Sequence, residues 1–407
     1  MLLKQAFHKT RKLFIRLERS FSTNPRALLQ RLIFILVFIL FPANLAKHFV
    51  TPSSYVLGVL VDYLSPALYL TEILVFLLLI TSSWKKPVGE HRIFLLLLTL
   101  FLFSLLPSVF LSDLRVVSLV RFLEISLWLI FSYWVSQNVS WSRRREVFLL
   151  VGAGVLWSFL LALTQFILQR NIFGYWFLGE PTIYPSLAGV AKTSFLGADV
   201  LRPYATFPHP NVLGGVASVV FLWVLSTRLW GLAVSGFFGT LISFSRTAFV
   251  SLSLGFLGFL ILTRKMALFL MGYQTFFGDL SVSRRVDLLK SAFSMFKSAP
   301  FWGVGLSTFT RHLPEFGVPS GLTLFIQPVH NIFALVAAES GGFALLSFLL
   351  LFAFAFWTTV KRKQRLLAVS LSQIVLLGLF DHYFLTSPQG LFLLSLTLGL
   401  SFSYSQG

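Results

Sequence analysis

Few side chains in this sequence can exchange a proton near neutral pH, and His330 is the one that stands in a plausible motif. It follows Gln327-Pro-Val and comes directly before a long apolar run. Because histidine titrates close to neutrality, its imidazole can take the proton of an attacking hydroxyl group as a general base. His209 and His312 are competitors, and His382 follows another apolar run. The sequence therefore predicts His330 as the catalytic residue.

Three arginines precede or separate apolar runs in positions that could hold an anion. They are Arg202, Arg246 and Arg285. A guanidinium group is planar and presents its donors as a fork, which can bind two phosphate oxygens at once. Arg202 and Arg246 could instead contact lipid phosphates at a membrane boundary. Arg285 either projects from the apolar face of an amphipathic helix, where it needs an anionic partner, or precedes a helix that starts one residue later.

Three further polar residues are predicted to support these groups. Asn211 follows a proline-rich segment and can cap the helix that begins there. Asn331 directly follows His330. Glu339 lies inside the next apolar run, where a buried carboxylate is costly and usually has a partner.

The sequence predicts neither a metal site nor a cofactor. The chain has no Cys, which removes disulfides, thiolate catalysis and cysteine metal ligands. Outside the apolar runs, Asp and Glu do not form a cluster with the spacing of a metal site. The net charge of +19 could indicate a nucleic-acid partner, but in a chain this apolar we expect Lys and Arg to set the orientation in a membrane.

The apolar runs themselves predict an all-α integral membrane protein. Of the 407 residues, 56% are hydrophobic and 12% are charged, and the mean hydropathy is +0.83. A spanning helix needs about 20 mostly apolar residues. About twelve such helices are expected, of which 266–280 is the shortest in apolar length and is kept to preserve the sidedness of the chain. The ranges are 29–48, 67–84, 92–111, 115–137, 147–169, 211–228, 230–244, 246–263, 266–280, 331–359, 365–382 and 388–404.

The distribution of charge predicts which side each connector faces. Dense basic clusters fall in the short connectors, as the positive-inside rule expects of cytoplasmic segments. Both termini are then cytoplasmic, and the long loops 170–210 and 281–330 are extracytoplasmic. Residues 1–28 read as a basic cytoplasmic segment, and residues 29–407 as a single membrane domain. Within the second loop, 284–298 separates into apolar and polar faces, which predicts an amphipathic helix on the outer leaflet.

Several of these segments, taken in order over about 195–400, resemble the O-antigen ligase and polymerase family of membrane glycosyltransferases. The resemblance implies a glycan donor on undecaprenyl diphosphate, used without a metal, and an acceptor hydroxyl. It implies that Arg202, Arg246 and Arg285 hold the diphosphate and that His330 serves the acceptor. The segments that carry it are Arg202 with Phe207 and Pro210-Asn211, Ser245-Arg246, Arg285 with Pro300 to Gly305, His330-Asn331, and Glu339.

The chain departs from the family pattern in two places. Pro203 and Tyr204 stand where many relatives carry small residues, and 264–284 looks shortened. The expected partners are a polyprenyl-diphosphate-linked glycan, an acceptor glycan, glycolipid or protein hydroxyl, and membrane lipids, with no nucleic acid. Direct attack by the acceptor would invert the anomeric centre. The alternatives are a transporter or flippase for a lipid-linked or anionic solute, and a purely structural membrane component.

Overall fold

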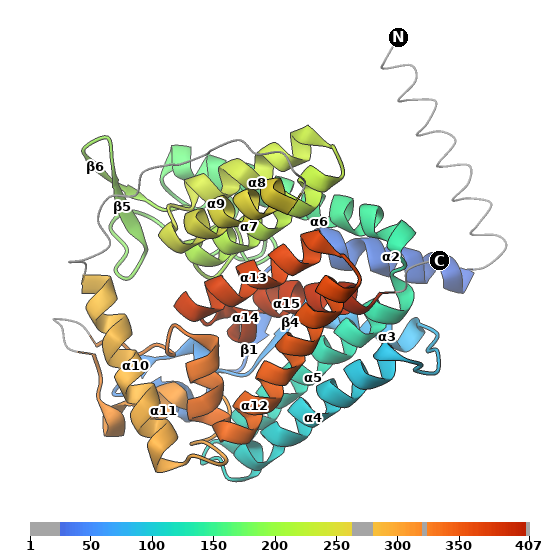
Figure 1. The fold of residues 1–407 in the computed structure, drawn as a ribbon. Coiled ribbons are helices and arrows are strands. Elements are labelled where there is room, and N and C mark those ends of the chain that lie inside the picture. Colours follow the sequence, from blue (N-terminus) through green and yellow to red (C-terminus); the bar gives the residue numbers. More distant parts are fainter. Residues whose placement is uncertain (1–24, 263–279, 320–323, 404–407) are drawn as a thin grey trace.

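Helices make up most of the fold in the computed structural model, which describes residues 25–262, 280–319 and 324–403. Figure 1 shows them as a bundle, with three small two-stranded sheets in the connecting segments. The helices of the bundle are α2 (Pro25–Leu40), α3 (Leu70–Thr81), α4 (Glu90–Phe110), α5 (Arg115–Asn138), α6 (Arg144–Leu168), α7 (Pro210–Ser226), α8 (Trp230–Ile242), α9 (Arg246–Leu262), α12 (Ile332–Lys361), α13 (Arg365–Phe380) and α15 (Pro388–Phe402).

The predicted class, an all-α membrane protein, agrees with this fold. By length and composition, four of the described helices could cross a membrane: α4, α5, α6 with the turn before it, and α12. The other apolar helices are shorter. Every predicted span except 266–280 contains a helix. That segment lies outside the described residues, apart from Leu280, which begins α10 (Leu280–Ser298).

Three predicted helices extend beyond the observed ones. The predicted 29–48 ends at Leu40, because Pro42 follows and has no N–H to continue the helix. Residues 46–48 instead form strand β1, which pairs antiparallel with β4 (Ala67–Tyr69), so the start of the predicted 67–84 is wrong as well. The predicted 365–382 ends at Phe380, after which Asp381 adopts an extended backbone. The error at 365–382 matters for the candidate site described below.

Helix α15 occupies the middle of the bundle. All of its residues from Pro388 to Phe402 are buried, as expected of a helix that is apolar all round. The ring of Phe392 stacks on Phe41 at 4.6 Å and on Phe131 at 5.9 Å. A side chain at Gly399 would collide with the carbonyl oxygen of Ser132, so glycine permits the close approach of α15 to α5. The bundle is therefore closed around an apolar central helix.

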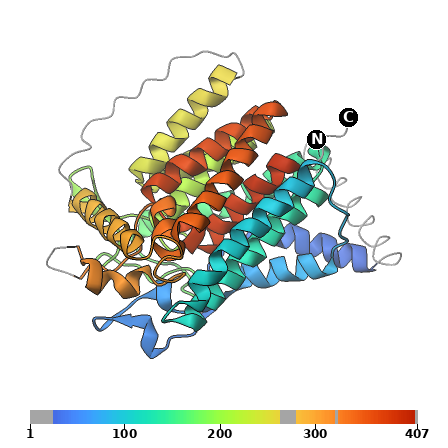
Figure 2. The same ribbon diagram turned by 60° about the horizontal axis from the view of Figure 1, so that its bottom comes forward.

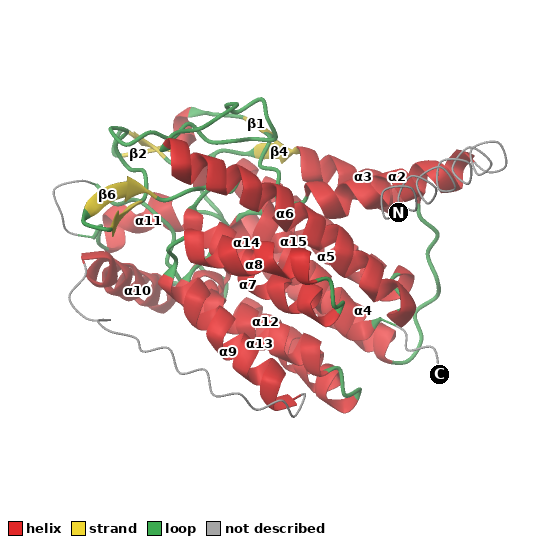
Figure 3. Cartoon of the chain, turned by 90° about the horizontal axis from the view of Figure 1, so that it is seen from above, coloured by secondary structure: helices red, strands yellow, loops and turns green. Residues whose placement is uncertain are grey.

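The connecting segments that carry the predicted site residues gather at one end of the bundle. Figures 2 and 3 show α10, α11 (Phe309–Phe316) and the small strands at this end. They include β2 (Tyr55–Val56) with β3 (Val59–Leu60), and β5 (Lys192–Phe195) with β6 (Ala198–Leu201). We call it the loop end. The two loops predicted to carry the chemistry thus lie together.

Candidate active site

Arg202 joins three elements at the loop end. It directly follows strand β6, and its main-chain N–H donates to Ala191 O at 3.0 Å. Its guanidinium donates from Nε to Ser243 O at 2.9 Å and from Nη2 to Asn211 Oδ1 at 2.7 Å. Burial lowers the pKa of Arg202 to about 10, and nearby arginines add to this effect. The side chain remains charged at neutral pH and connects the β5–β6 hairpin to the start of α7 and the α8–α9 turn.

Arg246 and Arg285 lie close enough to Arg202 for their charges to disfavour its protonated form. Arg246 is the first residue of α9, just after the turn whose Ser243 carbonyl Arg202 binds. Arg285 lies inside α10, which begins at Leu280, so the alternative that the helix starts after this residue is wrong. Three like charges in one region repel one another, and a bound anion would relieve that repulsion.

Asn211 connects these arginines to a carboxylate. Its Oδ1 accepts from Arg202, and its Nδ2 donates to Asp381 Oδ2 at 3.3 Å. The main-chain N–H of Asn211 also donates to Nδ1 of His209, which caps α7. Burial lowers the pKa of His209 to about 4, so this histidine is neutral and its Nδ1 is occupied by the cap. His209 therefore has a structural role in this arrangement.

Beside Asp381 lies the predicted general base. Atoms of His330, Asp381 and His382 that could bind a proton or a metal all lie within 4.8 Å of one another. The His330 and His382 rings meet edge to face at 5.2 Å. His330 Nδ1 is buried and has no hydrogen-bond partner. Burial lowers the pKa of His330 to about 3; Asp381 opposes this shift, and His382 and Arg285 add to it. At neutral pH the ring is uncharged and can accept a proton.

Sequence reasoning missed Asp381 and named His382 only as a histidine that follows another apolar run. The main-chain N–H of His382 donates to Asp381 Oδ1 at 2.9 Å, and its Nδ1 shares a hydrogen bond with Thr386 Oγ1 at 2.7 Å. Burial alone would raise the pKa of Asp381, but His330, His382 and Arg285 lower it overall, so the carboxylate is ionised. The available signal was an Asp-His pair inside a strongly apolar stretch, where such residues are rare without a function.

Asn331 fixes the geometry of this cluster. Its Oδ1 caps α12 by accepting from Phe333 N and Ala334 N, each at 2.9 Å. Its Nδ2 donates to Leu379 O at 3.2 Å, in the last turn of α13. One side chain thus ties the start of α12, where His330 lies, to the end of α13, where Asp381 lies.

Glu339 supports a different part of the loop end. Its carboxylate accepts from Ser307 N at 2.9 Å, from Phe309 N at 2.8 Å and from the Tyr63 hydroxyl at 2.9 Å. These bonds hold the segment that leads into α11. They place Glu339 in contact with a loop backbone and not with His330.

The glycines near Glu339 explain the Pro300-to-Gly305 motif by packing. Gly303 has φ +71°, and a Cβ there would lie 2.1 Å from the main chain of Glu339. Gly341 has φ +79° at a kink in α12 and approaches Phe301 in the same way. Gly305 N donates to Glu339 O at 3.0 Å. The motif therefore packs backbone to backbone against α12.

The remaining competitor, His312, contacts acidic side chains on α11 and the α4–α5 connector. Its Nε2 lies 3.7 Å from Asp113 and its Nδ1 lies 3.6 Å from Glu315.

Two imidazoles and a carboxylate are suitable metal ligands, so His330, Asp381 and His382 offer a possible metal site that the sequence prediction did not consider. Both Asp381 oxygens and His382 Nδ1 already take part in hydrogen bonds.

The comparison with known families gives one match. The family model for O-antigen ligase matches residues 211–349. The matched region contains Asn211, Arg246, Arg285 and His330, whereas Asp381 lies beyond it. The match confirms the resemblance to the O-antigen ligase and polymerase family drawn from the motifs. No curated protein matches the chain significantly.

Proposed function

We propose that this chain transfers a glycan from a polyprenyl diphosphate carrier to an acceptor hydroxyl, as an O-antigen ligase or polymerase does. The reaction would take place on the extracytoplasmic side of a bacterial inner membrane, without a metal and with inversion. The observation that carries the proposal is the chain of contacts from Arg202 through Asn211 to Asp381, beside His330. It joins an anion-binding group to a proton-accepting group in one place.

The arginines would bind the leaving group. When the bond between the anomeric carbon and the diphosphate oxygen breaks, its electron pair leaves with the diphosphate. Negative charge then grows on that oxygen. Preorganised guanidinium groups stabilise such charge in the way that a divalent cation does elsewhere. Arg202 is held by Ser243 and Asn211, so its orientation is fixed before the donor arrives.

His330 would act on the acceptor. A neutral imidazole with an unbonded nitrogen takes the proton as the acceptor oxygen forms its bond to the anomeric carbon. The ionised Asp381 then stabilises the imidazolium, a role familiar from Ser-His-Asp sites. His330 and the arginines that would bind the diphosphate are separate groups. Attack by the acceptor opposite the departing diphosphate is therefore favoured, and the configuration at the anomeric carbon inverts.

The transporter alternative predicts charged residues along a central water-filled path. In the part of the chain that the structure describes, the middle of the bundle is the buried apolar helix α15, and the predicted arginines lie at the loop end. This arrangement favours a surface transferase. The shorter apolar helices are compatible with a multi-pass protein of about twelve spans.

The proposal can be tested with purified protein in vesicles, a radiolabelled polyprenyl-diphosphate glycan and candidate acceptors. We expect His330→Ala to abolish transfer, with donor binding nearly unchanged, because it removes the base and leaves the phosphate clamp. Arg202→Lys keeps the charge but loses the planar fork, so it should weaken donor use by roughly 1–3 kcal/mol. Near-normal transfer by a well-folded His330→Ala protein would overturn the base assignment.

A further inference from the structure

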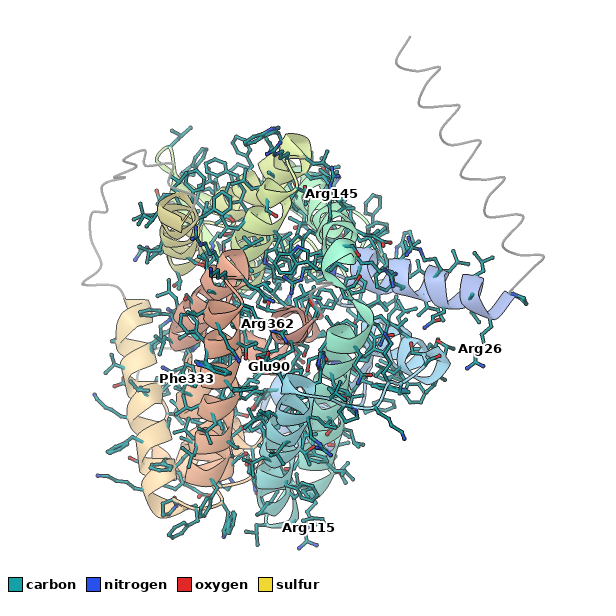
Figure 4. The ribbon with its side chains drawn as sticks, turned by 45° about the vertical axis from the view of Figure 1, so that its right-hand side comes forward. Arg26, Glu90, Arg115, Arg145, Phe333 and Arg362 are labelled. Carbon is teal, nitrogen blue, oxygen red and sulfur yellow. The ribbon has the colours of Figure 1, made fainter. Side chains whose placement is uncertain are left out.

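A cavity of about 720 Å³ lies where α6 begins, α7 ends and α13 begins. These helix ends belong to the part of the bundle opposite the loop end, and Figure 4 shows Arg145 at the outer end of α6. The cavity is lined by an unusual concentration of cationic side chains. They are Arg144, Arg145, Arg228, Lys363 and Arg365.

One of these cations is structural. Arg144 is buried and donates to Leu400 O and to Ser403 Oγ, at the end of α15. Its guanidinium also stacks on the Trp141 ring, with the guanidinium carbon 4.0 Å from the ring centre. Arg144 therefore forms a fixed wall of the cavity and positions Trp141 at its edge.

Three exposed cations of the lining, Arg145, Arg228 and Lys363, have no acidic partner among the described residues. Two neighbouring carboxylates bind other cations. Glu146, next to Arg145, binds Arg31 and Arg143, and Glu90 binds Lys361 and Arg362, just before Lys363 (Figure 4 labels Glu90 and Arg362). Arg145, Arg228 and Lys363 thus concentrate positive charge at the cavity that no described carboxylate neutralises.

Two tight turns present cations at the cavity. Arg228 has φ +64° and Lys363 has φ +53°, left-handed conformations that glycine adopts more readily. Each of these two turns therefore places a cation, and not a glycine, at the cavity. Helices α6 and α13 begin here with partial positive charge, and α7 ends here with partial negative charge. The cationic side chains therefore make the cavity favour an anion.

The remaining lining is apolar, which determines the kind of anion. Phe148, Leu366 and Leu367 line the same cavity, and Trp141 is about half exposed. Tryptophan is enriched at the level of lipid head groups, and basic pockets between helix ends bind anionic head groups. We propose that this cavity binds an anionic glycerophospholipid, with its phosphate among Arg145, Arg228 and Lys363 and an acyl chain along Phe148 and Leu366. This inference does not depend on the proposed transferase activity.

Native mass spectrometry of the full chain, released from membranes of phosphatidylcholine with phosphatidylglycerol or cardiolipin, tests the site. We expect the wild type to retain anionic lipid in preference to phosphatidylcholine. The triple variant Arg145→Gln, Arg228→Gln and Lys363→Gln should lose at least about tenfold of that preference. The matched control changes three exposed basic residues outside the cavity lining: Arg26→Gln, Lys86→Gln and Arg92→Gln. The control should keep the preference; an equal loss would indicate diffuse attraction and overturn the site.

A second variant keeps every charge. Ser226 lines the cavity, and Ser226→Trp should fill it and displace the lipid; full retention would overturn the proposal even if the triple variant fails to fold. Titration of the wild type with inorganic phosphate distinguishes a lipid head group from a free phosphate as the bound anion. We expect phosphate to compete only weakly. Displacement of all bound lipid by phosphate at comparable concentration would assign the cavity to a soluble anion.

Discussion

A single amide links the two chemical halves of the candidate site. Because the Oδ1 of Asn211 accepts from Arg202, its Nδ2 is left to donate to Asp381, so the orientation of the amide is fixed by both partners. Asp381 in turn lies beside His330. Under the proposed function, a change in Arg202 on donor binding would therefore reach Asp381, the carboxylate beside His330.

Asp381→Asn should separate donor binding from turnover. The amide removes the negative charge that stabilises protonated His330, so we expect kcat to fall by about 10- to 100-fold, given the strength of a close charge pair near a protein surface. Loss of a negative charge beside the diphosphate should leave KM for the donor unchanged or lower it. Initial-rate kinetics with the purified enzyme measure both constants.

Glu315→Gln is the matched control for Asp381→Asn, because Glu315 is an exposed carboxylate at the same end of the protein. It should change neither constant.

A chelator tests the alternative that His330, Asp381 and His382 are metal ligands. Activity that disappears on chelation and returns with a divalent cation would contradict the metal-free mechanism.

The pH dependence should differ between free enzyme and donor complex. Burial and the nearby cation Arg285 lower the pKa of His330 to about 3, so the base stays neutral and kcat/KM should persist as the pH falls well below 6. In the donor complex the negative diphosphate favours the protonated ring and raises its pKa. Since protonation inactivates the base, kcat should decline at a higher pH than kcat/KM. If kcat and kcat/KM declined at the same acidic pH, His330 would not lie near the bound diphosphate.

At the scale of elements, the sequence located the helices well and their ends less well. Apolar runs predict a helix wherever they are long enough, but the end of a run does not mark the last helical residue. The predicted range 365–382 includes Asp381, whereas the helix ends at Phe380. The hydrogen bond from Asn331 to Leu379 O, a tertiary contact that no local pattern encodes, brings the two segments together.

The contact between the Pro300-to-Gly305 segment and α12 gives a prediction at this scale. Gly303→Ala should destabilise the protein by roughly 3 kcal/mol or more, because it adds a backbone collision to the cost of a positive φ. Gly189→Ala is the control: it has φ +81° but open space around its Cβ position, so it incurs only the conformational cost. Thermal unfolding in detergent should show a clearly larger decrease in Tm for Gly303→Ala. Equal decreases would mean that the close approach does not hold this segment.

For the whole molecule, the distribution of charge and the arrangement of the helices both distinguish two ends. The dense basic connectors around Arg144 and Arg362 meet at one end, where both side chains bind Ser403. The loops with the candidate site lie at the other end. The sequence predicted this division because Lys and Arg accumulate on the cytoplasmic side of a membrane, whereas the cavity and the convergence of the loops depend on packing between distant segments.

Reporter insertions test that division directly. Reporters placed after Arg144 and after Arg362 should be cytoplasmic, whereas reporters within 180–195 and within 312–325 should be extracytoplasmic. The two loop positions form the decisive pair, because the segments that contain the arginines and His330 must share one side if they bind one substrate. Each insertion is scored with two reporters, one active only in the cytoplasm and one active only outside it, so an unfolded fusion gives neither signal. Loops on opposite sides would rule out a shared active site, and both loops in the cytoplasm would reverse the proposed orientation.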